Sequence, residues 1–269
     1  MNRTPDGPAG PTTADLWDRL RRTTPARIGL GRVGHALPLG EVLDFQLAHA
    51  RARDAVHGVL DRDALGQALA PLPIVMVESA AADRAIYLRR PDLGRQLSPV
   101  SARMLAELAT RGDPCDVLFV LGDGLSPGAV ETRGPALVKA AIGELAGLSI
   151  GPVILAHQAR VALGDPVGEA LRARICVMIV GERPGLSVAD SLGIYLTLAP
   201  RSGRRDSERN CISNIHDAGG LSCAEAARKL SWLVREALRR GLSGVGLKEE
   251  ASLASPTVAD LPPSSRPTP

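Results

Sequence analysis

Aromatic side chains are scarce in this chain, which has two Trp, two Tyr and two Phe among 269 residues. The core must therefore be built from Ala, Leu, Val and Ile, which suits helices packed on a sheet. The scarcity argues against a surface that stacks nucleic-acid bases, because such surfaces are made of aromatic rings. The net charge is only +3, and the arginines are interleaved with Asp and Glu. We therefore expect no nucleic-acid partner.

The chain also lacks paired cysteines and long apolar runs. Its four cysteines form no C-x-x-C pair, so neither a zinc site nor a redox dithiol is supported and no metal site is predicted. Cys115 and Cys176 lie at the start of apolar runs and are expected to be small buried hydrophobic residues. Residues 1–13 contain no apolar stretch typical of a secretory signal. No run approaches the roughly 20 residues that span a bilayer. These absences predict a cytoplasmic protein without a membrane partner.

Three familiar catalytic patterns are absent: the G-x-S-x-G elbow, the Walker A loop and the H-E-x-x-H helix. The segment Gly29-Leu-Gly31-Arg-Val-Gly34 does match G-x-G-x-x-G. A dinucleotide site needs a strand before that motif and a helix directly after it. Only Ala26-Arg27-Ile28 precedes it, and His35-Ala-Leu-Pro38 follows, so a glycine-rich docking loop is favoured. A stand-alone nucleotide-binding α/β oxidoreductase remains the alternative that this motif suggests.

The rest of the chain is organised around Ile175-Cys-Val-Met-Ile-Val180, six apolar residues that predict a strand buried on both faces. The run ends at Gly181-Glu-Arg-Pro-Gly185. Pro184 fixes its own φ, and Gly185 permits a sharp turn. A charged pair is thus held at the carboxyl end of a buried strand, where ligands bind in open α/β sheets. An ordinary exit from the strand is the alternative.

Similar apolar runs alternate with helical patterns, which predicts an α/β fold with a mostly parallel sheet flanked by helices. The expected strands are Ile74–Val77, Val117–Leu121, Ser149–His157, Ile175–Val180 and Gly193–Ala199. The expected helices are Ala14–Arg22, Glu41–Leu60, Asp61–Ala70, Ser98–Arg111, Gly128–Ala146, a short helix capped by Asp165 and ending at Arg172, and Ser222–Arg240. The last helix carries its own end signals, a capping box of Ser222 and Glu225 and a stop at Gly241.

We expect four segments along the chain. They are a flexible or helical amino terminus, a helical extension, a Rossmann-like domain, and a disordered tail rich in Pro and Ser, at residues 1–24, 25–112, 113–248 and 249–269. The longest helix of the extension has an apolar stripe that includes Val42, Phe45 and Val56. His49 and His57 are two turns apart on it, too far for a metal pair. They form either a polar helix edge or a subunit or substrate-entry contact.

A parallel sheet would gather the carboxyl ends of its strands at one edge. There the sequence places Gly122-Asp123-Gly124, His157-Gln158 and Glu182-Arg183, and a later loop, Arg209–Asn214, could join them. Glycines let backbone amides approach a polar ligand, and Glu182 can accept hydrogen bonds. Asp123 and Glu182 would form an acid/base pair only if the fold brought them close. Each polar residue could equally be a cap or turn former. These residues alone predict a ligand-binding α/β domain.

Six ordered motifs between about Ala26 and Lys248 go further. They are Ala26-Arg-Ile-Gly-Leu-Gly-Arg32, Asp44-Phe-Gln-Leu-Ala-His-Ala-Arg-Ala-Arg-Asp-Ala-Val56, Arg90-Pro-Asp-Leu-Gly-Arg95, Leu121-Gly-Asp-Gly-Leu-Ser126, Gly181-Glu-Arg-Pro-Gly-Leu186 and Arg209-Asn-Cys-Ile-Ser-Asn-Ile215. Together they resemble the small (light) subunit of ethanolamine ammonia-lyase. The resemblance implies an adenosylcobalamin-dependent radical lyase that converts ethanolamine to acetaldehyde and ammonia. A TIM-barrel large subunit would hold the substrate, and a Rossmann-like small subunit would bind the cofactor at the interface, in an assembly of six large and six small subunits.

The resemblance also carries cobalamin contacts onto Val161, Glu182 and Cys211. It implies an apolar contact from Val161, a hydrogen-bond acceptor in Glu182 and a small polarizable group in Cys211. It implies no catalytic residue in this chain. The D-x-H-x-x-G motif that supplies a cobalt ligand is absent, so the cofactor's own benzimidazole is expected to remain the lower ligand. A location inside a bacterial microcompartment and a purely supporting role for the subunit both stay open.

Overall fold

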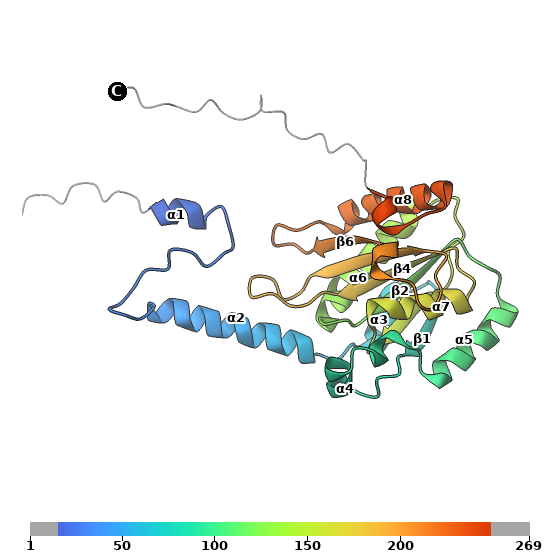
Figure 1. Ribbon diagram of the computed structural model, residues 1–269, viewed down its shortest axis with the longest axis horizontal. Coiled ribbons are helices and arrows are strands. Elements are labelled where there is room, and N and C mark those ends of the chain that lie inside the picture. The colour runs from blue at the N-terminus through green and yellow to red at the C-terminus, as the bar shows by residue number, and fades with distance from the viewer. Residues whose placement is uncertain (1–15, 249–269) are drawn as a thin grey trace, which may run out of the picture.

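The apolar run at the centre of the chain forms strand β4 (Ile175–Gly181), in which every residue is buried. In this computed structural model, which describes residues 16–248, β4 belongs to a six-stranded sheet of order β1-β3-β2-β4-β5-β6 (Figure 1). Strands β1, β3, β2 and β4 are parallel, and β5 is antiparallel to both β4 and β6. The other strands are β1 (Ile74–Glu78), β2 (Val117–Gly122), β3 (Val153–His157), β5 (Leu192–Leu198) and β6 (Arg209–Ile215). The predicted α/β class is therefore confirmed.

Strand β6 corrects the sequence prediction, which was wrong in making Arg209–Asn214 a loop. It pairs with β5, with Tyr195 opposite Cys211 and Ile194 opposite Ile212. Only Arg209, Ile212 and Ile215 of this strand are buried. An edge strand with one solvated face contains few apolar residues, so its sequence lacks the unbroken run that marks β4.

Helices cover both faces of the sheet. On one face lie α3 (Arg62–Leu69), α6 (Pro127–Glu144) and α8 (Cys223–Arg240), and on the other lie α5 (Pro99–Arg111) and α7 (Gly164–Ala170). The shorter elements are α1 (Leu16–Arg21), α4 (Arg84–Arg89), η1 (Leu93–Arg95), η2 (Val161–Leu163), η3 (Asp206–Glu208) and η4 (Gly244–Gly246). Helix α8 confirms its end signals, because Ser222 and Glu225 form the capping box and Gly241 is left-handed with φ +69°.

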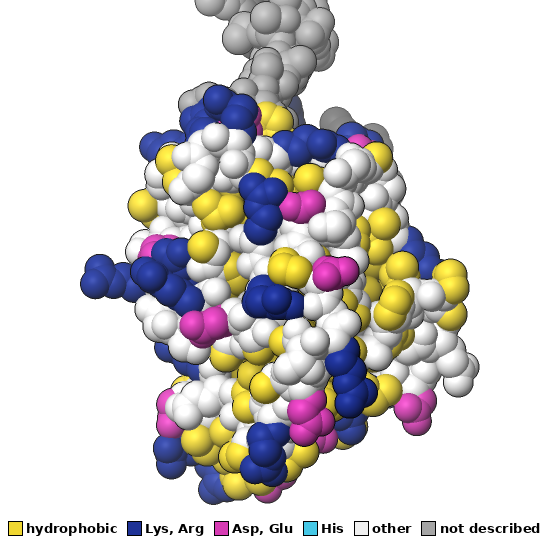
Figure 2. All heavy atoms as spheres, turned by 90° about the vertical axis from the view of Figure 1, so that its right-hand side faces the viewer, with side chains coloured by type: hydrophobic (Ala, Val, Ile, Leu, Met, Phe, Trp, Pro, Cys, Tyr) yellow, Lys and Arg dark blue, Asp and Glu magenta, His cyan; other side chains and the backbone are white. Residues whose placement is uncertain are grey.

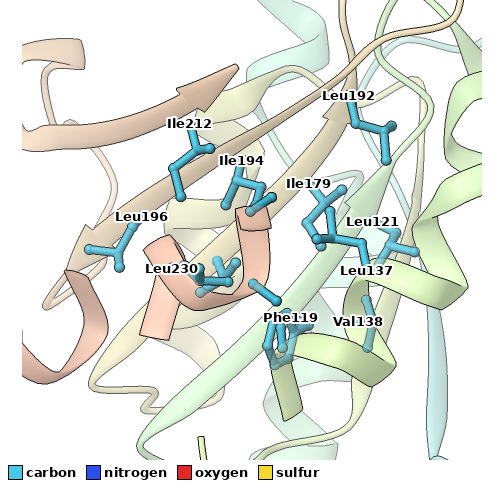
Figure 3. Packing of buried hydrophobic residues seen from close by; sticks show 14 of the residues in the cluster. Phe119, Leu121, Leu137, Val138, Ile179, Leu192, Ile194, Leu196, Ile212 and Leu230 are labelled. Carbon is cyan, nitrogen blue, oxygen red and sulfur yellow. The ribbon is translucent and has the colours of Figure 1, made fainter. Parts of the chain in front are cut away.

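Two apolar clusters fill the space between the sheet and its helices. Phe119 and Ile179 point toward α6 and α8, where they meet Leu137 and Leu230 (Figure 3). The alternate strand residues point toward α5 and α7. Strands β2 and β4 are buried on both faces, which explains why their apolar runs are unbroken. Cys115 and Cys176 are buried in the second cluster, as predicted.

Helix α2 (Leu39–His57) forms where the periodicity predicts a helix, but it extends away from the sheet (Figure 1). None of its residues is buried. Phe45, in the predicted apolar stripe, is 46% exposed and Leu43 is 53% exposed. The stripe therefore packs on no core within residues 16–248.

The surface mixes both signs of charge. On the face in Figure 2, basic and acidic side chains are interspersed with hydrophobic ones. Within the described part of the chain, no helix combines the length and the apolar character needed to cross a membrane. The predicted disordered ends, residues 1–13 and 249–269, lie outside the described residues. The predicted boundary at residue 113 stays a prediction, although β1 from the second segment pairs with β3.

Candidate ligand crevice at the carboxyl edge of the sheet

Two adjoining cavities open near the carboxyl ends of β2, β3 and β4. The Glu182 cavity has a volume of about 400 Å³ and the Cys211 cavity about 330 Å³. Arg160, Val161 and Tyr195 line both. The three residues to which the resemblance assigned cofactor contacts therefore lie around one crevice. Val161 is shared, Glu182 lines the larger cavity and Cys211 lines the smaller one.

Glu182 directly follows β4 and is anchored at the rim of the crevice. Its backbone N–H donates to the Ser191 carbonyl at 2.9 Å. Its Oε2 accepts from Ser191 Oγ at 2.6 Å and from the Asn214 N–H at 3.3 Å. A Cβ at Gly193 would lie 2.9 Å from Oε1, so the glycine leaves room for the carboxylate. Oε2 is thus held by two hydrogen bonds from this chain. Oε1 accepts no hydrogen bond from the described residues.

Two glycines allow the turn after β2 to cross the end of β4. The Leu125 N–H donates to the Gly181 carbonyl at 2.9 Å. Gly124 has φ +55°, and a Cβ there would lie 2.2 Å from that carbonyl oxygen. A Cβ at Gly181 would lie 2.1 Å from the Ser126 carbonyl oxygen. The glycines that the sequence placed at strand ends are therefore required by this close backbone approach.

Tyr195 and Cys211 are cross-strand partners beside the crevice. Burial raises the pKa of Tyr195 to about 12, and neighbouring Cys211 adds to the shift. Partial burial also raises the pKa of the Cys211 thiol, although a hydrogen bond from Tyr195 opposes this. Both groups stay protonated at neutral pH, so the crevice offers a polarizable thiol and not a thiolate nucleophile. Sequence reasoning missed Tyr195, because only the β5–β6 register reveals it.

Arg160 brings positive charge to both cavities. Its guanidinium carbon lies 4.3 Å from the centroid of the Tyr87 ring, and Nη2 is 3.4 Å from the Tyr87 carbonyl oxygen. Its Nε is buried and has no hydrogen-bond partner within residues 16–248. A guanidinium with unused N–H donors suits a carbonyl, carboxamide or phosphate oxygen. Sequence reasoning missed this residue too, although it immediately precedes Val161.

Asp123 has a different environment from Glu182. It is 1% exposed, and its carboxylate accepts from the backbone N–H groups of Gln158 and Ala159 at 2.9 and 2.8 Å. Burial raises the pKa of Asp123, although those two donors and the charge of Arg84 oppose the shift. Because its oxygens are committed to the backbone, the predicted option of an Asp123–Glu182 acid/base pair gains no support.

Asp165 was predicted to cap α7, and this was wrong. Its carboxylate forms a bidentate ion pair with Arg209 of β6: Nη1 donates to Oδ1 at 2.6 Å and Nη2 donates to Oδ2 at 2.7 Å. Both side chains are 2% exposed. Burial raises the pKa of Asp165, and the Arg209 hydrogen bonds oppose the shift. The attraction of a buried arginine outweighs local capping, and the pair fixes the start of β6, two residues before Cys211.

The glycine-rich motif, Gly29 to Gly34, lies in the segment between α1 and α2. No strand precedes it among the described residues, and α2 begins only at Leu39. Arg27, just before the motif, donates to the carbonyl of Leu186 at 3.3 Å. The strand–turn–helix context of a dinucleotide site is therefore missing from this segment.

Comparison with known proteins identifies the family. The sequence model of the ethanolamine ammonia-lyase light-chain family matches residues 14–248. The chain belongs to the ethanolamine ammonia-lyase light-chain family. An ethanolamine ammonia-lyase small subunit of Rhodopseudomonas palustris is 53% identical over 253 residues, covering 93% of this chain and 95% of that protein. The ethanolamine ammonia-lyase small subunit of Bradyrhizobium diazoefficiens is 53% identical, covering 88% of this chain and 92% of that protein. The one of Xanthomonas campestris is 52% identical, covering 90% of this chain and 91% of that protein. The resemblance drawn from the six motifs is confirmed.

Proposed function

We propose that this chain is the small subunit of an adenosylcobalamin-dependent ethanolamine ammonia-lyase, which deaminates ethanolamine to acetaldehyde and ammonia. In this proposal it binds the cobalamin at the interface with a large catalytic subunit. The family and the names of its relatives support the subunit and its partner. The cofactor role rests on one observation, the gathering of Val161, Glu182 and Cys211 around a single crevice.

The chemistry of the crevice fits one side of a corrinoid. Cobalamin presents carboxamide groups, which donate and accept hydrogen bonds, and a negatively charged phosphodiester. Glu182 Oε1 can accept from an amide, and Arg160 can donate to a carbonyl or phosphate oxygen. Val161 offers an apolar contact. A corrinoid is larger than either cavity, so this chain supplies one wall and the large subunit supplies the other.

Within the assembly this chain binds and orients, and it contributes no catalytic residue. When bound, the cofactor supplies radical chemistry by homolysis of its cobalt–carbon bond. The protonated thiol of Cys211 and phenol of Tyr195 pack against the cofactor and help to exclude water from it. The proposal includes an assembly of six large and six small subunits, in the cytoplasm or inside a bacterial microcompartment.

The test is co-expression with a candidate large subunit, followed by cobalamin titration and acetaldehyde release. The chain alone should have no lyase activity, and the complex with adenosylcobalamin should have it. Turnover by the isolated chain would contradict this division of labour. A nicotinamide cofactor should give no binding heat with the isolated chain, and tight binding would revive the oxidoreductase alternative.

Glu182→Ala tests the cofactor contact. We expect about tenfold weaker cobalamin binding by the complex, because the hydrogen-bond acceptor proposed for the cofactor is lost. The matched control is Glu107→Ala on α5, where Glu107 is exposed and outside both cavities; this variant should bind like the parent. Equal affinities for Glu182→Ala and the parent would favour a purely supporting subunit.

A further inference from the structure

A strained turn follows β3. Gln158 has φ +54°, a left-handed conformation that is uncommon for residues other than glycine. The next three residues, Ala159, Arg160 and Val161, all line the Glu182 cavity. The direction in which the chain leaves β3 at Gln158 therefore sets where Arg160 and Val161 lie.

Asp123 holds this turn from the neighbouring strand. It directly follows β2, which pairs with β3. Its Oδ2 accepts from the Gln158 N–H at 2.9 Å and its Oδ1 from the Ala159 N–H at 2.8 Å. The two donors come from consecutive residues, whose N–H groups point to opposite sides in an extended strand, so the turn is what brings both to one carboxylate. Strained backbone of this kind persists only where surrounding contacts enforce it.

A second set of contacts fixes the same segment from the other side. The Tyr87 hydroxyl donates to the Ala159 carbonyl at 3.1 Å. Arg84 lies 4.7 Å from the centroid of the Tyr87 ring, and its Nη1 is 3.5 Å from Asp123 Oδ2. The amide of Ala159 is thus bound to Asp123, and its carbonyl to Tyr87. Arg84 provides the positive charge that a buried carboxylate requires.

We propose that Asp123 is a positioning residue for cofactor binding. Its carboxylate holds the Gln158–Ala159 turn in the left-handed form and thereby fixes Arg160 and Val161 in the crevice. Asp123 lines neither cavity, so in this role it would act without contacting the cofactor. This inference rests on the proposed function, because it concerns the residues that would contact cobalamin.

Asp123→Asn is the informative variant because it keeps size and shape. An asparagine has one acceptor oxygen, so its NH2 group would face one of the two backbone N–H donors. In the complex with the large subunit, we expect cobalamin affinity to fall about tenfold. We expect kcat at saturating cofactor to change less than about twofold, because Asp123 acts only through the placement of the segment.

Asp116→Asn is the matched control. Asp116 precedes the same strand at its opposite end, and its Oδ2 accepts from the Ser149 N–H at 2.9 Å. The substitution is chemically identical but lies outside both cavities. Cobalamin affinity should stay within about twofold of the parent, since none of the crevice contacts is changed.

Hydrogen exchange gives a readout that does not depend on cobalamin. In the complex without cofactor, a peptide covering residues 156–163 should exchange its amide hydrogens faster in Asp123→Asn than in the parent. In Asp116→Asn the exchange rate of the same peptide should equal that of the parent. If the parent complex bound no cobalamin, the proposed function would fail. Hydrogen exchange would still test whether Asp123 holds the Gln158–Ala159 turn. Parent-like exchange together with parent-like affinity in Asp123→Asn would overturn the inference.

The double variant Asp123→Asn with Gln158→Gly completes the test, and it serves if Asp123→Asn alone does not fold. Glycine adopts positive φ without strain, so the turn needs less enforcement. We expect the double variant to bind cobalamin more tightly than Asp123→Asn, or, where the single variant is unfolded, to recover a folded complex. No recovery of either kind would show that Asp123 does not act through the turn.

Discussion

Helices α8 and α2 have nearly the same length, 18 and 19 residues, but opposite relations to the core. Sequence periodicity predicts an apolar stripe on α2, and α8 is predicted from its end signals. Helix α8 buries seven residues, among them Leu230 and Val234, against the sheet and α6. Helix α2 buries none and extends away from it (Figure 1).

The ends of the two helices differ in the same way. Helix α8 starts at a capping box and stops at a left-handed glycine. Helix α2 follows Pro38 without a side-chain cap and ends at Gly58 with φ −56°. Packing usually contributes most of a helix's stability. An apolar stripe therefore predicts that a helix has a face to bury, but not that its own chain will bury it.

The largest expected effect is in the core under α8. Leu230→Ala should lower the free energy of unfolding of the isolated chain by about 3 kcal/mol, because Leu230 is fully buried and its loss leaves a cavity. Urea unfolding followed by circular dichroism measures this. A loss below about 1 kcal/mol would mean that α8 is not part of the cooperative core.

A smaller effect is expected at the helix ends. Gly241→Ala should cost about 1 kcal/mol, because Gly241 has φ +69° and alanine is strained there. Gly58→Ala at the end of α2 is the matched control, since its φ of −56° suits alanine. It should change stability by less than about 0.5 kcal/mol. Equal costs at the two sites, by the same urea measurement, would remove this part of the contrast.

The smallest effect is expected on α2 itself. Leu43→Ala should change the unfolding free energy of the isolated chain by less than about 0.5 kcal/mol, because Leu43 is 53% exposed. If it cost as much as Leu230→Ala, α2 would be packed in solution, for example against a second copy. Sedimentation of the parent and of Leu43→Ala at several concentrations would then distinguish packing of α2 against a second copy from packing within one chain.

The sequence predicted the fold well where each residue carried an unambiguous local signal. Unbroken runs of apolar residues marked β2 and β4, because both faces of these strands are buried. Strand β6 was missed because only three of its seven residues are buried. The others are polar or exposed, so the segment has no unbroken apolar run. Asp165 was mistaken for a cap because its partner, Arg209, is 44 residues away in the chain.

The crevice shows the same limit. Motif resemblance selected Val161, Glu182 and Cys211, and the fold places all three around adjoining cavities. It gave no indication of Tyr195 or Arg160, whose positions depend on strand register and on stacking over Tyr87. Nor could it show that Asp123 is enclosed by backbone donors while Glu182 stays at the rim.

By itself, then, the sequence determined the family, the α/β class and the ends of α8, because each depends on residue identity over short or ordered stretches. Only the tertiary structure decided which apolar face is buried and which carboxylate faces the crevice. Those outcomes depend on contacts between residues far apart in the chain. Asp123 shows this most clearly, because its partners Gln158 and Ala159 lie 35 and 36 residues further along.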